Sequence, residues 1–192
     1  MTTVGILALQ GDVREHRAVL ESLGAEVVAV RRPSELDAVD GLVIPGGESS
    51  VMDKLARAFG LQQPLRERIA EGMPVYGTCA GLIMLADTVL DAIEGQESIG
   101  GFDLAVRRNA FGSQLDSFET DLDIPELGAP PVHAVFIRAP VVERVGPRAT
   151  VLSALPDGRV VAVEQGLLLG TAFHPEMTGE TRLHERFLQR IP

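Results

Sequence analysis

The feature that most constrains this chain is an apolar run, Met73–Tyr76, that leads directly into the glycine-flanked segment Gly77–Gly81. A small residue two places on either side of Cys79 suits a sharp strand-to-helix turn, because larger side chains would collide where the backbone doubles back. Such a turn holds the thiol clear of the sheet at a helix N-terminus, where the dipole favours the thiolate. The segment therefore predicts a strand, an elbow and a helix with a nucleophile between them. Taken alone, Cys79 is equally well explained as a small buried hydrophobic residue.

A second motif, Phe173–Glu176, favours the nucleophile interpretation. Pro175 biases His174 toward extended backbone, so the side chains of His174 and Glu176 can point to one side, where the carboxylate orients the imidazole. Together with Cys79, these residues predict a nucleophile, its base and the acid that orients the base. The alternative for His174 is a structural histidine at the end of a strand.

The other three histidines lack this relation to an acidic residue. His16 and His184 lie in helical patterns rich in charge, and we expect both at the solvated surface. His133 lies in the strand-like segment Val132–Phe136. His174 is therefore the candidate base.

Alternating apolar and amphipathic segments predict an α/β fold of the flavodoxin-like type, with a mostly parallel central sheet flanked by helices. The first half is expected to contain a strand at Val4–Leu9, a helix from Gly11 to Leu23 with Asp12 as its N-cap, strands at Ala25–Val30 and Gly41–Ile44, helices at Val51–Phe59 and Pro64–Glu71, and the strand before Cys79. The second half is expected to contain strands at Phe102–Arg107, Ala134–Ile137 and Val151–Leu155, a hairpin across Asp157–Gly158 that continues from Arg159 to Gly170, and a helix at Glu180–Gln189.

Length and composition predict one domain over residues 1–192 and exclude some classes of partner. A chain of 192 residues with 45% apolar content can bury one sizeable core, and no polar linker divides it. No apolar stretch reaches the roughly 18 residues of a membrane span, no leader pattern is visible, and the single cysteine suits a reducing compartment. We therefore expect a cytoplasmic protein without a membrane partner. A net charge of −10 argues against nucleic acid as a partner.

The loop Pro45–Ser50 is expected to share an edge of the sheet with both motifs, because ligands bind beyond the carboxyl ends of parallel strands. Its paired glycines allow backbone N–H groups to approach a ligand closely, so the loop can donate to an oxyanion together with the N–H of Ala80. The alternative is an ordinary Gly-rich turn in which Glu48 or Ser49 caps a helix. The loop lacks the Gly-Lys-Ser/Thr ending of a phosphate-binding loop.

Several segments spread over the whole chain resemble one known family. They are Leu9–His16, Pro45–Ser49, Gly77–Leu82, Arg108–Gly112, Asp116–Glu119 and Phe136–Pro140. The Gly-x-Cys-x-Gly elbow and the distant His-Pro-Glu motif resemble the class I (triad) glutamine amidotransferases. Within that family, the Leu-Gln-Gly and Phe-Ile-Arg-Ala-Pro segments resemble the glutaminase subunits of pyridoxal 5′-phosphate synthases.

The resemblance implies a glutaminase, without a metal or another cofactor, that hydrolyses L-glutamine to L-glutamate and ammonia. Cys79 would attack the side-chain amide, His174 would hold and return the proton, and Glu176 would fix the imidazole tautomer. The backbone N–H groups of Gly47 and Ala80 match the family's oxyanion hole.

The resemblance also implies which residues bind the amino-acid end of glutamine. They are Gly47, Glu48, Ser49, Arg108, Ile137 and Arg138. A guanidinium suits the α-carboxylate because its N–H groups match both oxygens. The alternative for Arg108 and Arg138 is a surface ion pair.

The family's partner is a (β/α)8 barrel synthase, in an assembly of twelve synthase and twelve glutaminase subunits, which uses the ammonia to make pyridoxal 5′-phosphate. Gln10 is expected to couple docking of the synthase to the oxyanion loop. Two alternatives remain, namely the glutaminase of another amidotransferase, such as imidazole glycerol phosphate synthase, and a non-catalytic regulatory relative.

Overall fold

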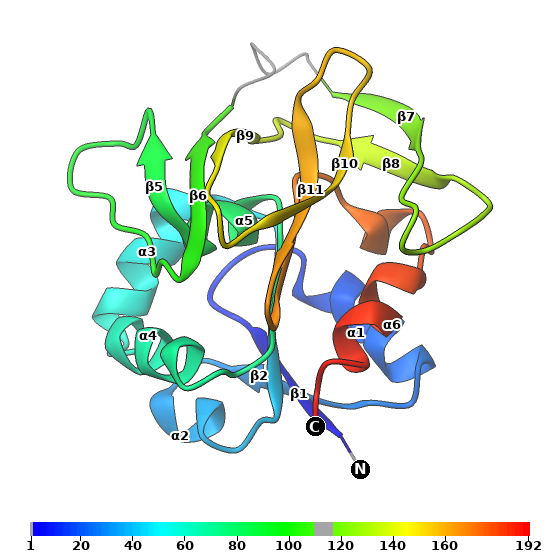
Figure 1. Ribbon diagram of the computed structural model, residues 1–192. Helices are drawn as coiled ribbons and strands as arrows, with labels where there is room; N and C mark the ends of the chain where they lie inside the picture. Colours follow the sequence, from blue (N-terminus) through cyan, green and yellow to red (C-terminus); the bar gives the residue numbers. More distant parts are fainter. Residues whose placement is uncertain (1, 110–116) are drawn as a thin grey trace.

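A computed structural model describes residues 2–109 and 117–192 and shows a central sheet with helices on both faces (Figure 1). The elements in chain order are β1 (Thr3–Leu7), α1 (Val13–Ser22), β2 (Glu26–Val30), α2 (Pro33–Leu36), β3 (Gly41–Ile44), α3 (Ser49–Ala58), α4 (Gln62–Ala70), β4 (Val75–Thr78), α5 (Ala80–Leu85), β5 (Ala86–Leu90), β6 (Phe102–Arg107), β7 (Phe118–Leu122), β8 (Val132–Phe136), β9 (Val141–Val145), β10 (Thr150–Ala154), β11 (Val160–Gln165), β12 (Leu168–Thr171), the 3₁₀ turn η1 (Pro175–Met177) and α6 (Arg182–Leu188).

The main sheet has the strand order β2-β1-β3-β4-β12-β11-β9-β6-β5, with β10 paired to β11. The strands from β2 to β12 run parallel. Beyond β12 the sheet is mixed, since β11 is antiparallel to its neighbours and β6 is antiparallel to β9 but parallel to β5. The predicted α/β architecture is confirmed, and its parallel half brings the ends of β3, β4 and β12 to one edge.

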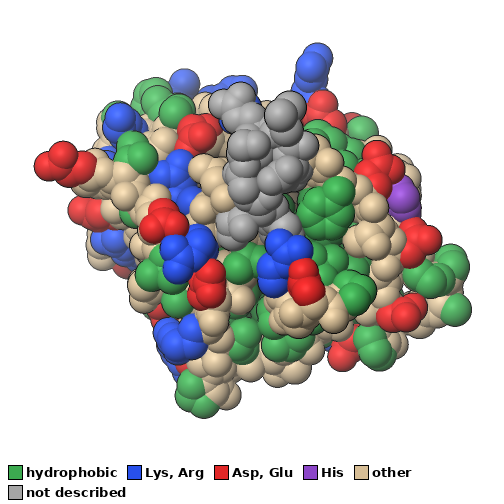
Figure 2. All heavy atoms as spheres, turned by 90° about the horizontal axis from the view of Figure 1, so that it is seen from above, with side chains coloured by type: hydrophobic (Ala, Val, Ile, Leu, Met, Phe, Trp, Pro, Cys, Tyr) green, Lys and Arg blue, Asp and Glu red, His purple; other side chains and the backbone are tan. Residues whose placement is uncertain are grey.

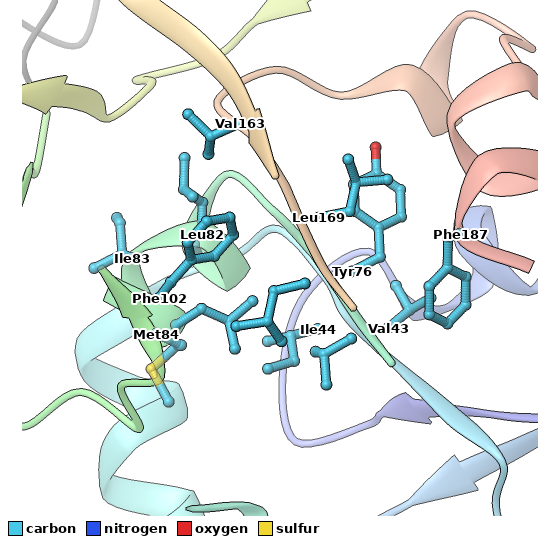
Figure 3. Close-up of a cluster of buried hydrophobic side chains, with 14 of the residues drawn as sticks. Val43, Ile44, Tyr76, Leu82, Ile83, Met84, Phe102, Val163, Leu169 and Phe187 are labelled. Carbon is cyan, nitrogen blue, oxygen red and sulfur yellow. The ribbon is translucent and has the colours of Figure 1, made fainter. Parts of the chain in front are cut away.

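The core lies on both faces of the central strands, and every residue of β3 and β4 is buried. On one face Tyr76 packs against Phe187 of α6, with ring centroids 6.2 Å apart. Leu82 of α5 and Phe102 of β6 pack together in another part of this cluster of buried hydrophobic side chains (Figure 3). None of the helices in residues 2–109 and 117–192 has the length and hydrophobicity that a membrane span requires.

Most predicted elements are found within a few residues of their expected ends, and the strands at Gly41–Ile44 and Phe102–Arg107 match fully. The hairpin turn at Asp157–Gly158 joins the antiparallel strands β10 and β11, as predicted. The sequence analysis missed β5, β7 and β9. The missed strand β5 lies at an edge of the sheet and exposes Asp87 and Thr88, so it lacks the apolar run that marks a buried strand.

The prediction that His16 and His184 lie at the surface is wrong, because both side chains are fully buried. His16 belongs to the buried face of α1, and its Nδ1 lies 2.9 Å from Nε2 of His184 on α6. The Nε2 of His16 lies 3.0 Å from Oγ1 of Thr78, the last residue of β4. The charged neighbours of each histidine occupy the outer face of its helix, while the histidines join the two helices to the sheet.

Burial keeps both of these histidines neutral. It lowers the pKa of His16 well below its usual value of 6.5, and the nearby His184 and His174 act in the same direction. Burial also lowers the pKa of His184 to about 4, against the opposing effect of the Glu180 backbone and charge. Protonation of either ring would place a charge in the core.

We expect the protein to lose stability as pH falls below about 6.5. In the unfolded chain both histidines bind protons near pH 6.5, whereas in the fold they stay neutral to lower pH. Their contribution is thus complete above pH 6.5 and declines below it, by up to about 1.4 kcal/mol per histidine for each pH unit. Urea unfolding at pH 6.5, 5.5 and 5.0 measures this decline.

The matched control is His133→Gln. The neighbours Asp121 and Glu119 raise the pKa of the exposed His133, so its contribution is complete below pH 6.5 and lost at higher pH. Between pH 6.5 and 5.0, the free energy of unfolding of this variant should therefore fall as steeply as that of the wild type. A free energy of unfolding that stays constant from pH 6.5 to 5.0 would contradict the prediction.

Candidate active site

The elbow predicted at Cys79 is present, with the strained backbone that such a turn requires. Cys79 lies between β4 and α5 with φ 49° and ψ −102°, an uncommon conformation for a residue with a side chain. A Cβ on Gly81 would lie 2.0 Å from the carbonyl oxygen of Ile44, and one on Gly77 would lie 2.6 Å from the backbone of Gly81. Gly81 is thus required by its contact with β3, and Gly77 by its contact with Gly81 within the elbow.

The three residues proposed as nucleophile, base and acid lie together. The Nδ1 of His174 donates to Oε1 of Glu176 over 2.7 Å, and the Glu176 side chain is fully buried. The Cys79 thiol and the His174 ring line the same cavity, and the Cys79 sulfur lies 3.9 Å from the carbonyl oxygen of Ile137. Because Nδ1 is bonded to Glu176, we infer that Nε2 is the nitrogen that faces the sulfur.

The electrostatics of this group hold a proton on His174. Burial alone would lower its pKa, but hydrogen bonds to Cys79 and Glu176 and the charges of both groups raise the pKa to about 10. A protonated ring beside the nucleophile can give its proton to a leaving group. The arrangement is therefore suited to nucleophilic attack followed by proton transfer from His174.

Sequence analysis missed a second carboxylate at this histidine. Asp12 was expected only as a helix N-cap; it holds that position, but its side chain accepts no capping hydrogen bond. Instead its Oδ2 lies 3.5 Å from Nδ1 of His174. Burial raises the pKa of Asp12, an effect that the charge of His174 opposes and that of Glu176 reinforces. The Leu-Gln-Gly-Asp order gave no signal for this contact.

Asp12, His174 and Glu176 offer possible metal ligands within 4.8 Å of one another. They include the proposed base His174 and the buried carboxylate that is bonded to it. A metal ion on Nδ1 of His174 would displace its hydrogen bond to Glu176, so this cluster is better explained as part of the nucleophile's site.

Glu176 also lies near His16, the other buried histidine. Nε2 of His16 is 3.6 Å from Oε1 of Glu176 and 3.0 Å from Oγ1 of Thr78. A carboxylate favours an N–H over a lone pair at this distance, so we infer that His16 carries its proton on Nε2 and accepts from His184 at Nδ1. The buried carboxylate thus faces an N–H from each side.

A cavity of about 420 Å³ opens onto the nucleophile, a size typical of small-molecule sites. It is lined by Gln10, Asp12, Gly47, Glu48, Ser49, Cys79, Ile83, Arg108, Asn109, Ile137, Arg138, His174 and Met177. The structure therefore brings all six predicted glutamine-binding residues to Cys79. Ala80 follows Cys79 as the first residue of α5, and Glu176 lies behind His174.

Two of the predicted glutamine-binding residues contact each other directly. Nη2 of Arg108 donates to Oε1 of Glu48 over 2.9 Å, and the Arg108 side chain is only 9% exposed. The ion-pair alternative for Arg108 is therefore partly correct, although the pair lies in the cavity wall. Arg138 also lines the cavity and follows β8 with φ 46°. In the motif Arg108–Gly112, residues 110–112 lie outside the described part of the chain, as does Asp116.

Gln10, the predicted coupling residue, holds the Gly-rich loop. Its Oε1 accepts a hydrogen bond from the Glu48 N–H over 2.7 Å. A Cβ on Gly47 would lie 2.3 Å from this same oxygen, and Gly47 has φ 155°. Only glycine lets the loop approach Gln10 so closely.

Seen from above in Figure 2, the face of the molecule carries interspersed acidic and basic side chains.

The SNO glutamine amidotransferase family matches residues 6–192 of the chain. The chain belongs to this family. The curated relative named "Pyridoxal 5′-phosphate synthase subunit PdxT" from Leifsonia xyli subsp. xyli is 73% identical over 188 residues, which cover 98% of this chain and 95% of that protein. The protein of the same name from Acidothermus cellulolyticus is 59% identical over 192 residues, which cover 98% of this chain and 93% of that protein.

Solved structures of glutamine amidotransferases share the architecture of this SNO family member. A crystal structure described as a glutamine amidotransferase matches with a TM-score of 0.91 and 46% identity over 98% of each chain. A glutamine amidotransferase from Thermotoga maritima matches with a TM-score of 0.64 and 15% identity, covering 98% of this chain and 83% of that one. The second likeness concerns the fold alone.

Proposed function

We propose that this chain is the glutaminase subunit of a pyridoxal 5′-phosphate synthase, which hydrolyses L-glutamine to L-glutamate and ammonia. The observation that carries the proposal is the placement of Cys79 and His174 in the wall of one cavity, with His174 bonded to buried Glu176. Membership of the SNO glutamine amidotransferase family and the names of its relatives support the choice of reaction.

In the proposed reaction, the Cys79 sulfur attacks the side-chain amide carbon of glutamine and forms a tetrahedral intermediate. His174 then donates its proton to the departing ammonia, which leaves a thioester. His174 next takes a proton from a water molecule that attacks the thioester, and glutamate leaves. Glu176 holds the imidazole in the orientation that both steps need.

The backbone N–H groups of Gly47 and Ala80 are the proposed oxyanion hole. Ala80 is the first residue of α5, so its N–H has no partner within the helix. Gly47 belongs to the loop that Gln10 holds through Glu48. Removal of one such donor costs about 3 kcal/mol of transition-state stabilisation in comparable sites.

The cavity wall supplies groups for both charges of the amino-acid end. Arg108 and Arg138 are the proposed partners of the α-carboxylate, and Glu48 is suited to the α-ammonium group. Gly47, Ser49 and Ile137 complete the proposed contacts, since all of them line the cavity with Cys79. A substrate with both charges would bind between the arginines and Glu48.

Ammonia is mostly ammonium in water at neutral pH, so a biosynthetic glutaminase must pass its product directly to a second protein. We propose a (β/α)8 barrel synthase as that partner, in an assembly of twelve subunits of each kind. The whole chain would act as one glutaminase domain in the cytoplasm, where a reducing environment preserves the single cysteine.

Purified protein should release ammonia from L-glutamine, and the cognate barrel synthase should increase the rate. Cys79→Ala should abolish turnover with or without the synthase because the nucleophile is removed, and circular dichroism should show the same fold. A coupled assay of ammonia and glutamate measures the turnover rates with and without the synthase. Activation only by an unrelated synthase would show another amidotransferase, and inactivity with every partner would leave a regulatory relative.

Glu176→Gln should slow turnover by about 10- to 10⁴-fold while the protein stays folded. The amide still fills the buried position, but it no longer stabilises an imidazolium. Steady-state kinetics with the synthase present measures the loss. Asp121→Asn is a matched control, since Asp121 contacts the exposed His133 and lies apart from the cavity residues. Equal rates for Glu176→Gln and wild type would refute the orienting role.

Gln10→Ala should leave the fold intact and reduce activation by the synthase. Its amide oxygen is a partner of the Glu48 N–H, so its loss should uncouple the Gly-rich loop from docking. The ratio of glutaminase rates with and without the synthase measures this effect. Gln63→Ala is the control, since Gln63 is an exposed residue of α4 whose side chain bonds only to Glu67 in the described residues. An unchanged ratio for Gln10→Ala would argue against coupling.

A further inference from the structure

Gln96 connects two parts of the cavity wall without lining the cavity itself. Its Nε2 donates to Oγ of Ser49 over 3.0 Å, and its Oε1 accepts from Nη1 of Arg108 over 2.9 Å. The Ser49 and Arg108 side chains belong to segments far apart in the sequence. One amide group therefore sets the distance between the loop after β3 and the end of β6.

The segment that carries Gln96 is fastened to the protein by a buried carboxylate. Asp53 on α3 is 1% exposed and accepts from the backbone N–H of Glu97 over 3.0 Å and from Nη2 of Arg57 over 2.7 Å. The same Arg57 group donates to the carbonyl oxygen of Gly95 over 3.0 Å. The residues on both sides of Gln96 are thus held against α3.

Within Gln96's own turn, the backbone also fixes the amide. The Gln96 N–H donates to the carbonyl oxygen of Ile93 over 3.0 Å, and the Ile93 N–H approaches Oε1 of Gln96 at 3.4 Å. With the backbone and the side chain both restrained, the Gln96 amide presents one acceptor and one donor in fixed directions. Such restraint is more than a solvent-exposed loop residue needs.

We propose that Gln96 is a positioning residue for recognition of the substrate's α-carboxylate. This inference rests on the proposed glutaminase function. Arg108 has five N–H donors, of which Gln96 takes one on Nη1 and Glu48 takes one on Nη2. Among residues 2–109 and 117–192, no other group accepts from the Arg108 side chain, so the remaining three donors can face a carboxylate. A neutral acceptor at Nη1 holds the guanidinium in place without cancelling its charge.

The same geometry explains why an amide suits this position better than a carboxylate. A glutamate at position 96 would offer Arg108 a second negative neighbour beside Glu48 and would have no N–H for Ser49. Arg108 would then lie between two carboxylates that compete with the substrate. An alanine would leave Arg108 with Glu48 alone, so the guanidinium would be less well oriented.

The test compares glutaminase kinetics of the full chain with the barrel synthase for wild type, Gln96→Ala and Gln96→Glu. We expect Gln96→Ala to raise KM for L-glutamine by about 10-fold, as for loss of one hydrogen bond to a charged group, with kcat changed less than about 2-fold. Gln96→Glu should raise KM further. Combined with Arg108→Ala, Gln96→Ala should add little, because its effect acts through Arg108.

The matched control is Gln62→Ala, which loosens the same segment without touching the cavity wall. Gln62 donates to Oε2 of Glu97 over 3.0 Å and approaches Asp53 at 3.5 Å. This variant should keep both KM and kcat within about 2-fold of wild type. Thermal unfolding of all variants checks that the fold is retained.

A second substrate separates positioning from general loosening. The α-carboxamide of L-glutamine keeps the reactive side chain but lacks the negative charge, so wild type should prefer L-glutamine strongly. Gln96→Ala should lose about 10-fold of this preference in kcat/KM.

Unchanged KM and preference in an active Gln96→Ala would overturn the inference and leave the glutaminase function intact. Equal losses in Gln62→Ala would also overturn it. A wild type without glutaminase activity would instead overturn the proposed function, and this inference with it.

Discussion

The close approach of α5 to the end of β3 is the constraint on which the site depends. Where Gly81 faces the Ile44 carbonyl, a single added carbon would lie 2.0 Å from the oxygen. This close approach of the two backbones fixes the helix that follows Cys79. The backbone of Cys79 takes its strained conformation as a result. Because β3, β4 and β12 run parallel side by side, the same edge also receives the Gly-rich loop and His174.

The buried negative charge of Glu176 accounts for the arrangement of the two histidines around it. An isolated carboxylate in the core would be costly, so it needs partners that donate hydrogen bonds. His174 supplies a protonated ring at 2.7 Å, and His16 lies at 3.6 Å with its ring neutral. Two histidines around one carboxylate thus carry different charges. The difference follows from their surroundings, since His174 also faces Cys79 whereas His16 faces His184 and Thr78.

The sequence was most informative where one strong local rule operated. The elbow at Cys79, the continuous apolar strand at Gly41–Ile44 and the placement of His174 followed from glycine spacing, burial pattern and strand order. Residues whose role depends on contacts between distant elements left no such signal. His16, Asp12 and Gln96 were misjudged or overlooked because their partners lie on α6, just before η1 and just after β6, respectively. An amphipathic pattern places charge on the outer face of a helix, but it does not distinguish a buried histidine from an exposed one.

Hydrogen bonds join four residues of the cavity wall to Gln96, and the two charged groups among them, Glu48 and Arg108, pair with each other. Gln10 holds the backbone of Glu48, Glu48 pairs with Arg108, and Gln96 joins Arg108 to Ser49. This pairing limits the cost of placing an arginine that is 9% exposed in the wall. It also ties the wall together, since the guanidinium that the proposed carboxylate would reach is already bonded to Glu48 and Gln96. Because Glu48 and Gly47 are adjacent in one loop and both line the cavity with Cys79, the amino-acid end of the proposed substrate and its reacting amide would meet the same loop.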